Sequence, residues 1–177
     1  MTRLGLTVVP VLMTGITALA APVASAPAPQ PSATPAAGAG WPLLPGPDRV
    51  ADGFDPPAEP WLAGNRGVDL AGQAGQAVHA ATGGIVSFAG SIAGIGVVSV
   101  TDGAIRTTYQ PLHVAVREGQ RVSVGTVLGT LTAAGSHCAP RACLHWGLLR
   151  GEDYLDPLAL LGLEQVRLLP LPDSAAS

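Results

Sequence analysis

The chain has 177 residues, which is room for one domain of the usual size of about 100–200 residues. Its formal net charge of −3 and isoelectric point near 5.7 argue against nucleic-acid binding, which requires a basic surface. All nine basic residues are arginine, so a carrier domain that attaches biotin or lipoate to a lysine is excluded.

The first 26 residues are predicted to form an export signal. Arg3 gives a short positive start, and an almost wholly apolar stretch with small residues at its end follows, as a signal peptidase requires. We expect cleavage after Ala20 or Ser25. The alternative is an uncleaved membrane anchor, which a proline and a glycine inside the stretch disfavour. The segment has no cysteine, so no lipid anchor is expected there.

The next two segments are predicted to lack regular structure. Residues 27–40 are almost entirely Ala, Pro, Ser and Gly, which cannot bury enough apolar surface to become ordered, so we expect a disordered linker. Residues 41–64 are rich in proline and are predicted to lie across the domain as an irregular extended segment, anchored by Phe54 and Trp61. Residues 163–177 are expected to form a loose tail.

Residues 65–162 are predicted to form an all-β domain, a small antiparallel barrel or sandwich of short strands with one short C-terminal helix. Thr101-Asp102-Gly103-Ala104 is typical of a tight hairpin. Asp156 and Gly162 suit the N-terminal and C-terminal caps of the helix. The expected strands are 68–71, 77–80, 84–89, 96–101, 105–110, 121–124, 126–132 and 142–149.

Polar residues collect on one face of two of these strands. Asn65, Gly67 and Asp69 share a face near the start of the domain, and Cys143 and His145 share a face near its end. An extended strand would separate Asn65 from Asp69 by about 13 Å, but the intervening glycine permits a bend. The two faces together could line one groove. Taken alone, the aspartate could simply cap a turn and the histidine could simply pack with one hydrogen bond.

Several short sequence motifs occur along the chain in a fixed order. They are Arg66-Gly67-Val68-Asp69-Leu70, residues 80–90, residues 107–109, residues 116–129, Leu144-His145-Trp146-Gly147 and Tyr154-Leu155-Asp156-Pro157. In order and spacing they resemble the lysostaphin/LytM-type zinc metallopeptidases, which are cell-wall endopeptidases of the duplicated hybrid motif type. The resemblance covers roughly half of the chain and implies a β-barrel domain of that type.

The resemblance also implies a zinc site made by two histidines and one aspartate. Asp69 and His145 match two of the ligand positions, but the third holds Asn65. A neutral amide oxygen is a poor zinc ligand compared with imidazole, thiolate or carboxylate. We therefore expect a degenerate site at which zinc is possible but weakly held.

The family has two further histidines that handle the attacking water and the charge of the transition state. The corresponding positions here hold Pro111 and Cys143. His113 lies two residues beyond Pro111 and is a weak substitute, because only strand periodicity would place it on the same face. No catalytic residue can thus be assigned, and the resemblance implies a member that has lost catalysis.

The remaining histidines and the cysteines have simpler explanations. His79 lies in an alternating strand and His137 in a Gly-Ser-His turn, so both are expected to be surface or turn residues. Cys138 and Cys143 are expected to form a local disulfide, as exported chains meet an oxidising environment. The alternative makes Cys143 a thiolate zinc ligand beside His145, which would require Cys138 to stay unpaired.

Two functions follow as hypotheses. The first is a secreted or cell-envelope protein that is catalytically silent and either binds peptidoglycan stem peptides or regulates a cell-wall hydrolase. The second is a residual zinc metalloendopeptidase acting on peptidoglycan cross-links through Asp69, His145 and a substitute ligand. A serine hydrolase is not supported, because the sequence has no Gly-x-Ser-x-Gly motif.

Overall fold

The computed structural model describes residues 38–46, 49–59 and 61–163. The predicted export signal and most of the predicted linker and tail lie outside these residues. Within the described part of the chain, no helix is both long and apolar enough to cross a membrane.

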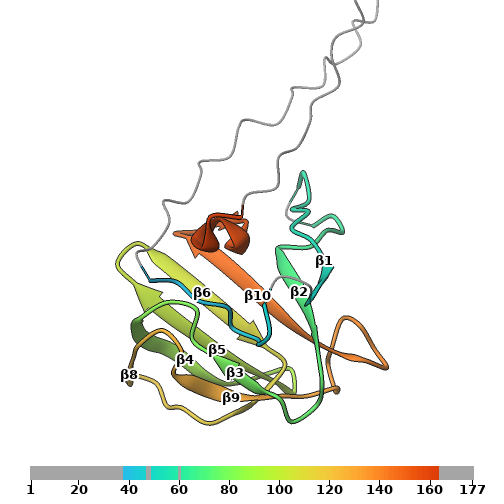
Figure 1. Cartoon of the computed structure of the whole chain (residues 1–177). Helices are drawn as coiled ribbons and strands as arrows, with labels where there is room; N and C mark the ends of the chain where they lie inside the picture. Colours follow the sequence, from blue (N-terminus) through green and yellow to red (C-terminus); the bar gives the residue numbers. More distant parts are fainter. Residues whose placement is uncertain (1–37, 47–48, 60, 164–177) are drawn as a thin grey trace, which may run out of the picture.

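The regular secondary structure of the described residues is almost entirely antiparallel strand, as the sequence predicts (Figure 1). The larger sheet has eight strands in the order β1-β2-β10-β6-β5-β4-β8, with β11 paired to β10, and the smaller sheet has the order β3-β9-β7. The strands are β1 (Val50–Asp52), β2 (Gly67–Gly72), β3 (Ala77–His79), β4 (Gly84–Ile92), β5 (Ile95–Asp102), β6 (Ile105–Gln110), β7 (Leu112–Val114), β8 (Arg121–Val122), β9 (Val127–Leu131), β10 (Ala142–Arg150) and β11 (Asp153–Leu155).

The hydrophobic core lies between the two sheets. In β10, Leu144, Trp146 and Leu148 are fully buried, and they share one cluster with Val78 of β3 and Leu128 of β9. Side chains alternate between the two faces of a strand. The other face of the larger sheet is therefore left for polar residues, and the candidate site lies there.

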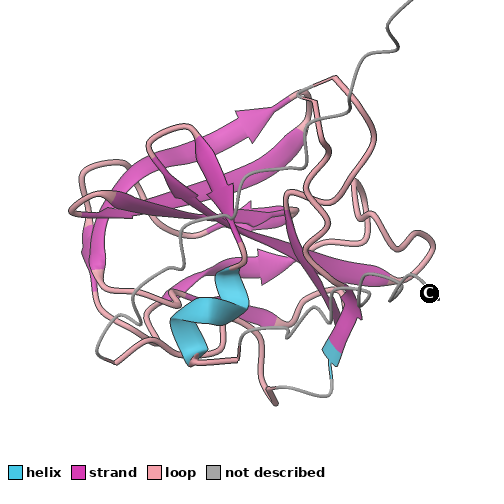
Figure 2. Ribbon diagram, turned by 90° about the horizontal axis from the view of Figure 1, so that it is seen from above, coloured by secondary structure: helices cyan, strands magenta, loops and turns pink. Residues whose placement is uncertain are grey.

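The predicted hairpin and the predicted helix are both present. Asp102 of β5 pairs with Ile105 of β6 across the turn, where Gly103 has a φ of 56°. The helix η2 (Pro157–Leu161) is of the 3-10 type and packs against β2 and β10. Figure 2 shows helices in cyan. Asp156 caps it by accepting a hydrogen bond from the Leu158 amide at 2.9 Å. Strands β1, β7 and β11, of three residues each, were not predicted, since runs this short carry no usable periodicity.

The predicted irregular segment, residues 41–64, packs on the domain only partly through the residues expected. Leu43 is fully buried, and the Trp41 ring lies 6.5 Å from that of Trp146, measured between centroids. Phe54 packs against the core as predicted. The prediction for Trp61 was wrong, because its exposed fraction is 78%. Size and apolarity alone did not distinguish a buried tryptophan from an exposed one.

A buried tyrosine ties the loop between β3 and β4 to the larger sheet. The Tyr109 hydroxyl donates to Thr107 Oγ1 and accepts a hydrogen bond from the Ala81 amide, both at 2.9 Å. Burial raises the pKa of Tyr109 to about 12, against the lowering effect of its hydrogen-bond partners, so the hydroxyl keeps its proton at all physiological pH values.

We predict that Tyr109→Phe lowers the free energy of unfolding by about 1–3 kcal/mol, because the buried Ala81 amide loses its acceptor. Tyr154→Phe is the matched control, since Tyr154 is 39% exposed, and should change it by less than about 0.5 kcal/mol. Urea denaturation measures both values. Equal stability of the two variants would contradict the assigned role of the buried hydroxyl.

Candidate functional site

The pairing of β2 with β10 brings the first two candidate residues together. Asp69 lies directly opposite His145 in the antiparallel register, and the two side chains project from the polar face of the sheet. His145 Nδ1 lies 3.0 Å from Asp69 Oδ1. A Cβ on Gly67 would meet the Trp146 carbonyl and lie 2.9 Å from His145 Nε2. Only glycine at this position leaves room for the imidazole ring.

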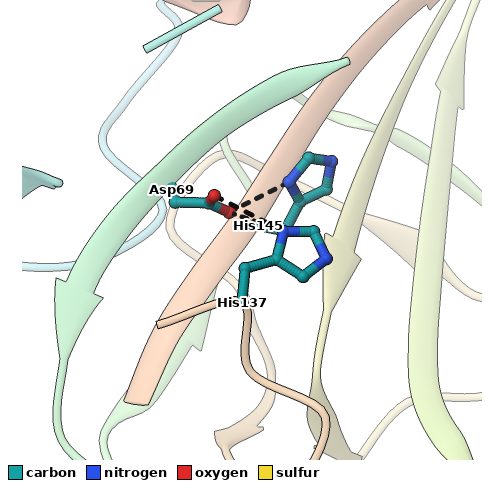
Figure 3. Close-up of side chains that lie close together, drawn as sticks. All are labelled: Asp69, His137 and His145. Atoms are coloured by element: carbon teal, nitrogen blue, oxygen red, sulfur yellow. Dashed lines mark hydrogen bonds and ion pairs between the residues drawn. The ribbon is translucent and has the colours of Figure 1, made fainter. Parts of the chain in front are cut away.

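The third member of the cluster is His137, which the sequence analysis interpreted only as a surface or turn histidine. It does lie in a turn and its side chain is 50% exposed, but its Nδ1 is 3.3 Å from Asp69 Oδ1. Its ring centroid is 4.8 Å from that of His145. Figure 3 shows the two imidazoles turned toward the same carboxylate. Asp69, His137 and His145 each offer one ligand atom, and these atoms lie within 4.8 Å of one another.

A disulfide and a pair of hydrogen bonds hold the turn that carries His137. Cys138 and Cys143 form a disulfide with their Cα atoms 5.7 Å apart, within the usual range of about 4.4–6.8 Å. The Ser136 hydroxyl accepts hydrogen bonds from the Cys138 amide at 3.2 Å and the Cys143 amide at 2.9 Å. The disulfide thus joins the residue after His137 to the strand that carries His145. His137 directly precedes Cys138, and this position in the sequence is the signal that would have indicated His137 as a residue of the site.

Asp69 is a carboxylate held in its charged form. Burial by itself raises the pKa of Asp69, but the hydrogen bond and charge attraction from His145, and then those from His137, outweigh it and lower the pKa below the ordinary value. A buried carboxylate that stays ionised beside two imidazoles is well suited to bind a cation.

Asn65 lies beside the cluster but presents its amide nitrogen to it. Its Nδ2 donates to the carbonyl of Gly53 at 3.0 Å and to Asp69 Oδ2 at 3.4 Å. The chain bends at Arg66, directly before the glycine that was expected to permit a bend, and Asn65 lies next to Asp69. In this orientation the amide supports the carboxylate as a hydrogen-bond donor, and an amide N–H group offers no lone pair to a metal.

The cluster lies in a groove of about 980 Å³ on the polar face of the larger sheet. Besides the cluster, its lining combines charged residues with apolar ones. Among them are Asp52, Asp55, Arg66, Arg106, Ile92 and Tyr154. The Arg66 guanidinium lies 5.8 Å from the centroid of the Tyr154 ring. Such a mixed lining suits a ligand that carries both charges and hydrocarbon.

Residues 63–157 match the sequence model of peptidase family M23. This match covers more than half of the chain and includes every strand of the groove except β1. The chain belongs to peptidase family M23.

Three relatives illustrate the likeness. The uncharacterized protein Rv2891 of Mycobacterium tuberculosis is 48% identical over 137 residues, covering 75% of this chain and 55% of that protein. The lipoprotein NlpD/LppB homolog of Pseudomonas aeruginosa is 36% identical over 101 residues, covering 55% of this chain and 33% of that protein. The catalytic domain of the antimicrobial peptidase lysostaphin from Staphylococcus simulans has the same fold, with a TM-score of 0.55 at 22% identity, covering 65% of this chain and 92% of that one. The chain spans about half the length, 55%, of the Mycobacterium relative.

The two positions at which the lysostaphin resemblance places proton-transfer histidines hold residues without an imidazole in this M23 domain. Pro111 is buried, and Cys143 is consumed in the disulfide. His113 is exposed on β7 of the smaller sheet and does not line the groove. His79, on β3 of that sheet, donates from its ring to the Gly125 carbonyl at 3.0 Å.

The M23 fold implies zinc, and the cluster fits it. Two imidazoles and a carboxylate are ligands that zinc accepts, at about 2.0–2.2 Å from the ion. Ligands at that distance in a tetrahedral site lie about 3.3 Å from one another. Asp69 Oδ1 lies 3.0 Å from His145 Nδ1 and 3.3 Å from His137 Nδ1, and all three ligand atoms lie within 4.8 Å of one another, so a shift of the side chains would let one ion contact all three. When bound, zinc would act as a Lewis acid toward an oxygen ligand in the groove.

We predict that Gly67→Ala lowers the free energy of unfolding by about 1–3 kcal/mol and displaces the His145 ring from Asp69. Gly83→Ala is the matched control, because a Cβ there would come no closer than 3.6 Å to any atom. Denaturation gives the stability, and the NMR signals of His145 report its environment. A Gly67→Ala protein with the stability and His145 signals of the control would disprove the close approach.

Proposed function

We propose that this chain is an exported cell-envelope protein whose M23 domain binds the peptides of peptidoglycan without cleaving them. One observation carries the proposal. The two positions at which the resembled peptidases have proton-handling histidines hold a buried proline and a disulfide-bonded cysteine. The groove is nevertheless present, and it holds three residues whose ligand atoms lie within 4.8 Å of one another.

Peptide hydrolysis needs a group that takes a proton from the attacking water and gives one to the leaving amine. Pro111 has no titratable group, and Cys143 has no thiol to ionise while it is bonded to Cys138. Gln110, which lies opposite His145 on β6 and lines the groove, does not titrate. The histidines that remain there, His137 and His145, are both turned toward Asp69.

The lining of the groove supports a peptide ligand of mixed charge. Arg66 and Arg106 can pair with carboxylates, and Asp52 and Asp55 can pair with amines. Peptidoglycan stem peptides carry both kinds of group, separated by short aliphatic side chains. Ile92 and Val97 provide apolar surface in the same groove. A silent domain of this kind could also present such a peptide to an active cell-wall hydrolase.

The cellular location is proposed from the sequence and from the relatives. The apolar first 26 residues have the composition of an export signal. The relative from Pseudomonas aeruginosa is a lipoprotein, which supports a place in the cell envelope. The disulfide suits an oxidising compartment outside the cytoplasm.

A second candidate function is a residual zinc metalloendopeptidase. It is favoured by the cluster of Asp69, His137 and His145, because three protein ligands leave a zinc position open for water or substrate. The two candidates differ only in catalysis, and one assay separates them.

We predict that the purified protein, loaded with zinc, releases no new amino groups and no soluble fragments from peptidoglycan sacculi. A protein of the same family with all its motif histidines serves as the positive control. The reason is the missing proton-transfer group at positions 111 and 143. Release that requires zinc and is lost in Asp69→Asn would establish the second candidate.

We predict that the protein sediments with insoluble peptidoglycan and that Arg106→Ala weakens this binding about tenfold, the value of one hydrogen bond to a charged group. Arg121→Ala is the matched control, because Arg121 is exposed on β8 and does not line the groove. Co-sedimentation at a series of protein concentrations gives both affinities. Equal loss in the two variants would indicate non-specific charge attraction, and absence of binding by the wild-type protein would refute the proposal.

A further inference from the structure

His137 occupies a position that none of the M23 motif residues explains. It comes from the connection between β9 and β10, eight residues before His145, and it is half-exposed at the edge of the groove. Its imidazole contacts the same buried carboxylate oxygen as that of His145. An exposed histidine gains little by adopting one orientation unless something holds it there, since ordering a side chain costs conformational entropy.

We propose that His137 is the third protein ligand of a zinc ion, in place of the ligand that Asn65 no longer provides, and that the Cys138–Cys143 disulfide holds it in position. The inference concerns metal binding and is independent of whether the groove binds peptidoglycan.

The donor atoms support a ligand set of Asp69, His137 and His145. Asp69 Oδ1 lies 3.0 Å from one imidazole nitrogen and 3.3 Å from the other. Without an ion, two imidazoles share a single carboxylate as their partner. With an ion among them, each of the three groups provides one lone pair to the metal. Asp69 is buried and His145 is partly buried, whereas His137 is half-exposed, so the open side of the site faces solvent.

Asn65 holds the carboxylate from the other side. It donates to Asp69 Oδ2 at 3.4 Å, while His145 contacts Asp69 Oδ1 and His137 Nδ1 lies 3.3 Å from Oδ1 and 3.4 Å from Oδ2. The amide thus helps to fix the carboxylate that faces the two imidazoles. Hydrogen bonds of this kind orient carboxylate ligands and raise metal affinity.

The disulfide is placed where it can preorganise the site. It bonds the residue directly after His137 to the residue two positions before His145, and Ser136 accepts hydrogen bonds from the amides of both cysteines. The turn therefore has its ligand in place before an ion arrives. Without the disulfide, metal binding would have to order the turn, which weakens affinity.

The test measures zinc affinity of the oxidised full-length protein by calorimetry, with the stoichiometry checked by elemental analysis. We expect one zinc per chain and a rise in Tm on zinc addition. His137→Ala should weaken zinc binding at least about a hundredfold, because one of three ligands is lost. His113→Ala is the matched control and should leave it unchanged, because His113 is an exposed histidine on β7 outside the groove.

Cobalt(II) provides a spectroscopic readout of the same site. The wild-type protein should give the intense visible bands of four-coordinate cobalt, and His137→Ala should lose them. The double variant Cys138→Ala, Cys143→Ala keeps all three ligands but frees the turn, and we expect its zinc affinity to fall at least about tenfold. Removing both thiols keeps Cys143 from acting as a new ligand. Circular dichroism checks that each variant is folded.

Each part of the proposal has an outcome that overturns it. Wild-type protein that binds no zinc, or a His137→Ala protein that binds zinc as tightly as wild type, disproves His137 as a ligand. A double cysteine variant with wild-type affinity disproves the role of the disulfide. None of these results bears on peptidoglycan binding, which the sedimentation assay measures separately.

Discussion

The antiparallel pairing of β2 with β10 is the constraint on which the site depends. Its register sets Asp69 directly opposite His145, and the absence of a side chain at Gly67 lets the imidazole approach the neighbouring strand. A shift of either strand by one residue would move its polar side chain, Asp69 or His145, towards the apolar core. The buried Leu144 and Trp146, on the opposite face of β10, prevent that shift. The same residues that form the core therefore fix the geometry of the site.

The cluster on this strand pair is a variant of the M23 arrangement rather than a simple remnant of it. Pro111 has no group that could move a proton, and Cys143 is bonded to Cys138. Three groups that could hold a cation lie together, and one of them, His137, comes from a loop. Cys143 therefore brings no imidazole to the groove, but its bond to Cys138 restrains the loop that carries His137.

Much of this architecture was predictable because it rests on local patterns. Alternation of apolar and polar residues indicated the longer strands, and the Asp-Gly pair within residues 101–104 indicated the hairpin. The order and spacing of the short sequence motifs identified the family, and the match over residues 63–157 confirms it. The irregular segment was harder to predict: both Trp41 and Trp61 are large and apolar, and only the shape of the folded domain decides that the first packs and the second is exposed.

The sequence by itself determined the fold class, the family, and the placement of Asp69 and His145 on polar faces of their strands. These properties depend on residue type and on spacing along one strand, which a reader of the sequence can see. Only the tertiary structure decided that His137 meets them, because a turn residue has no periodicity that fixes its direction. Its position follows from contacts that involve separate parts of the chain: the disulfide, the hydrogen bonds of Ser136, and the register that places Asp69 within reach.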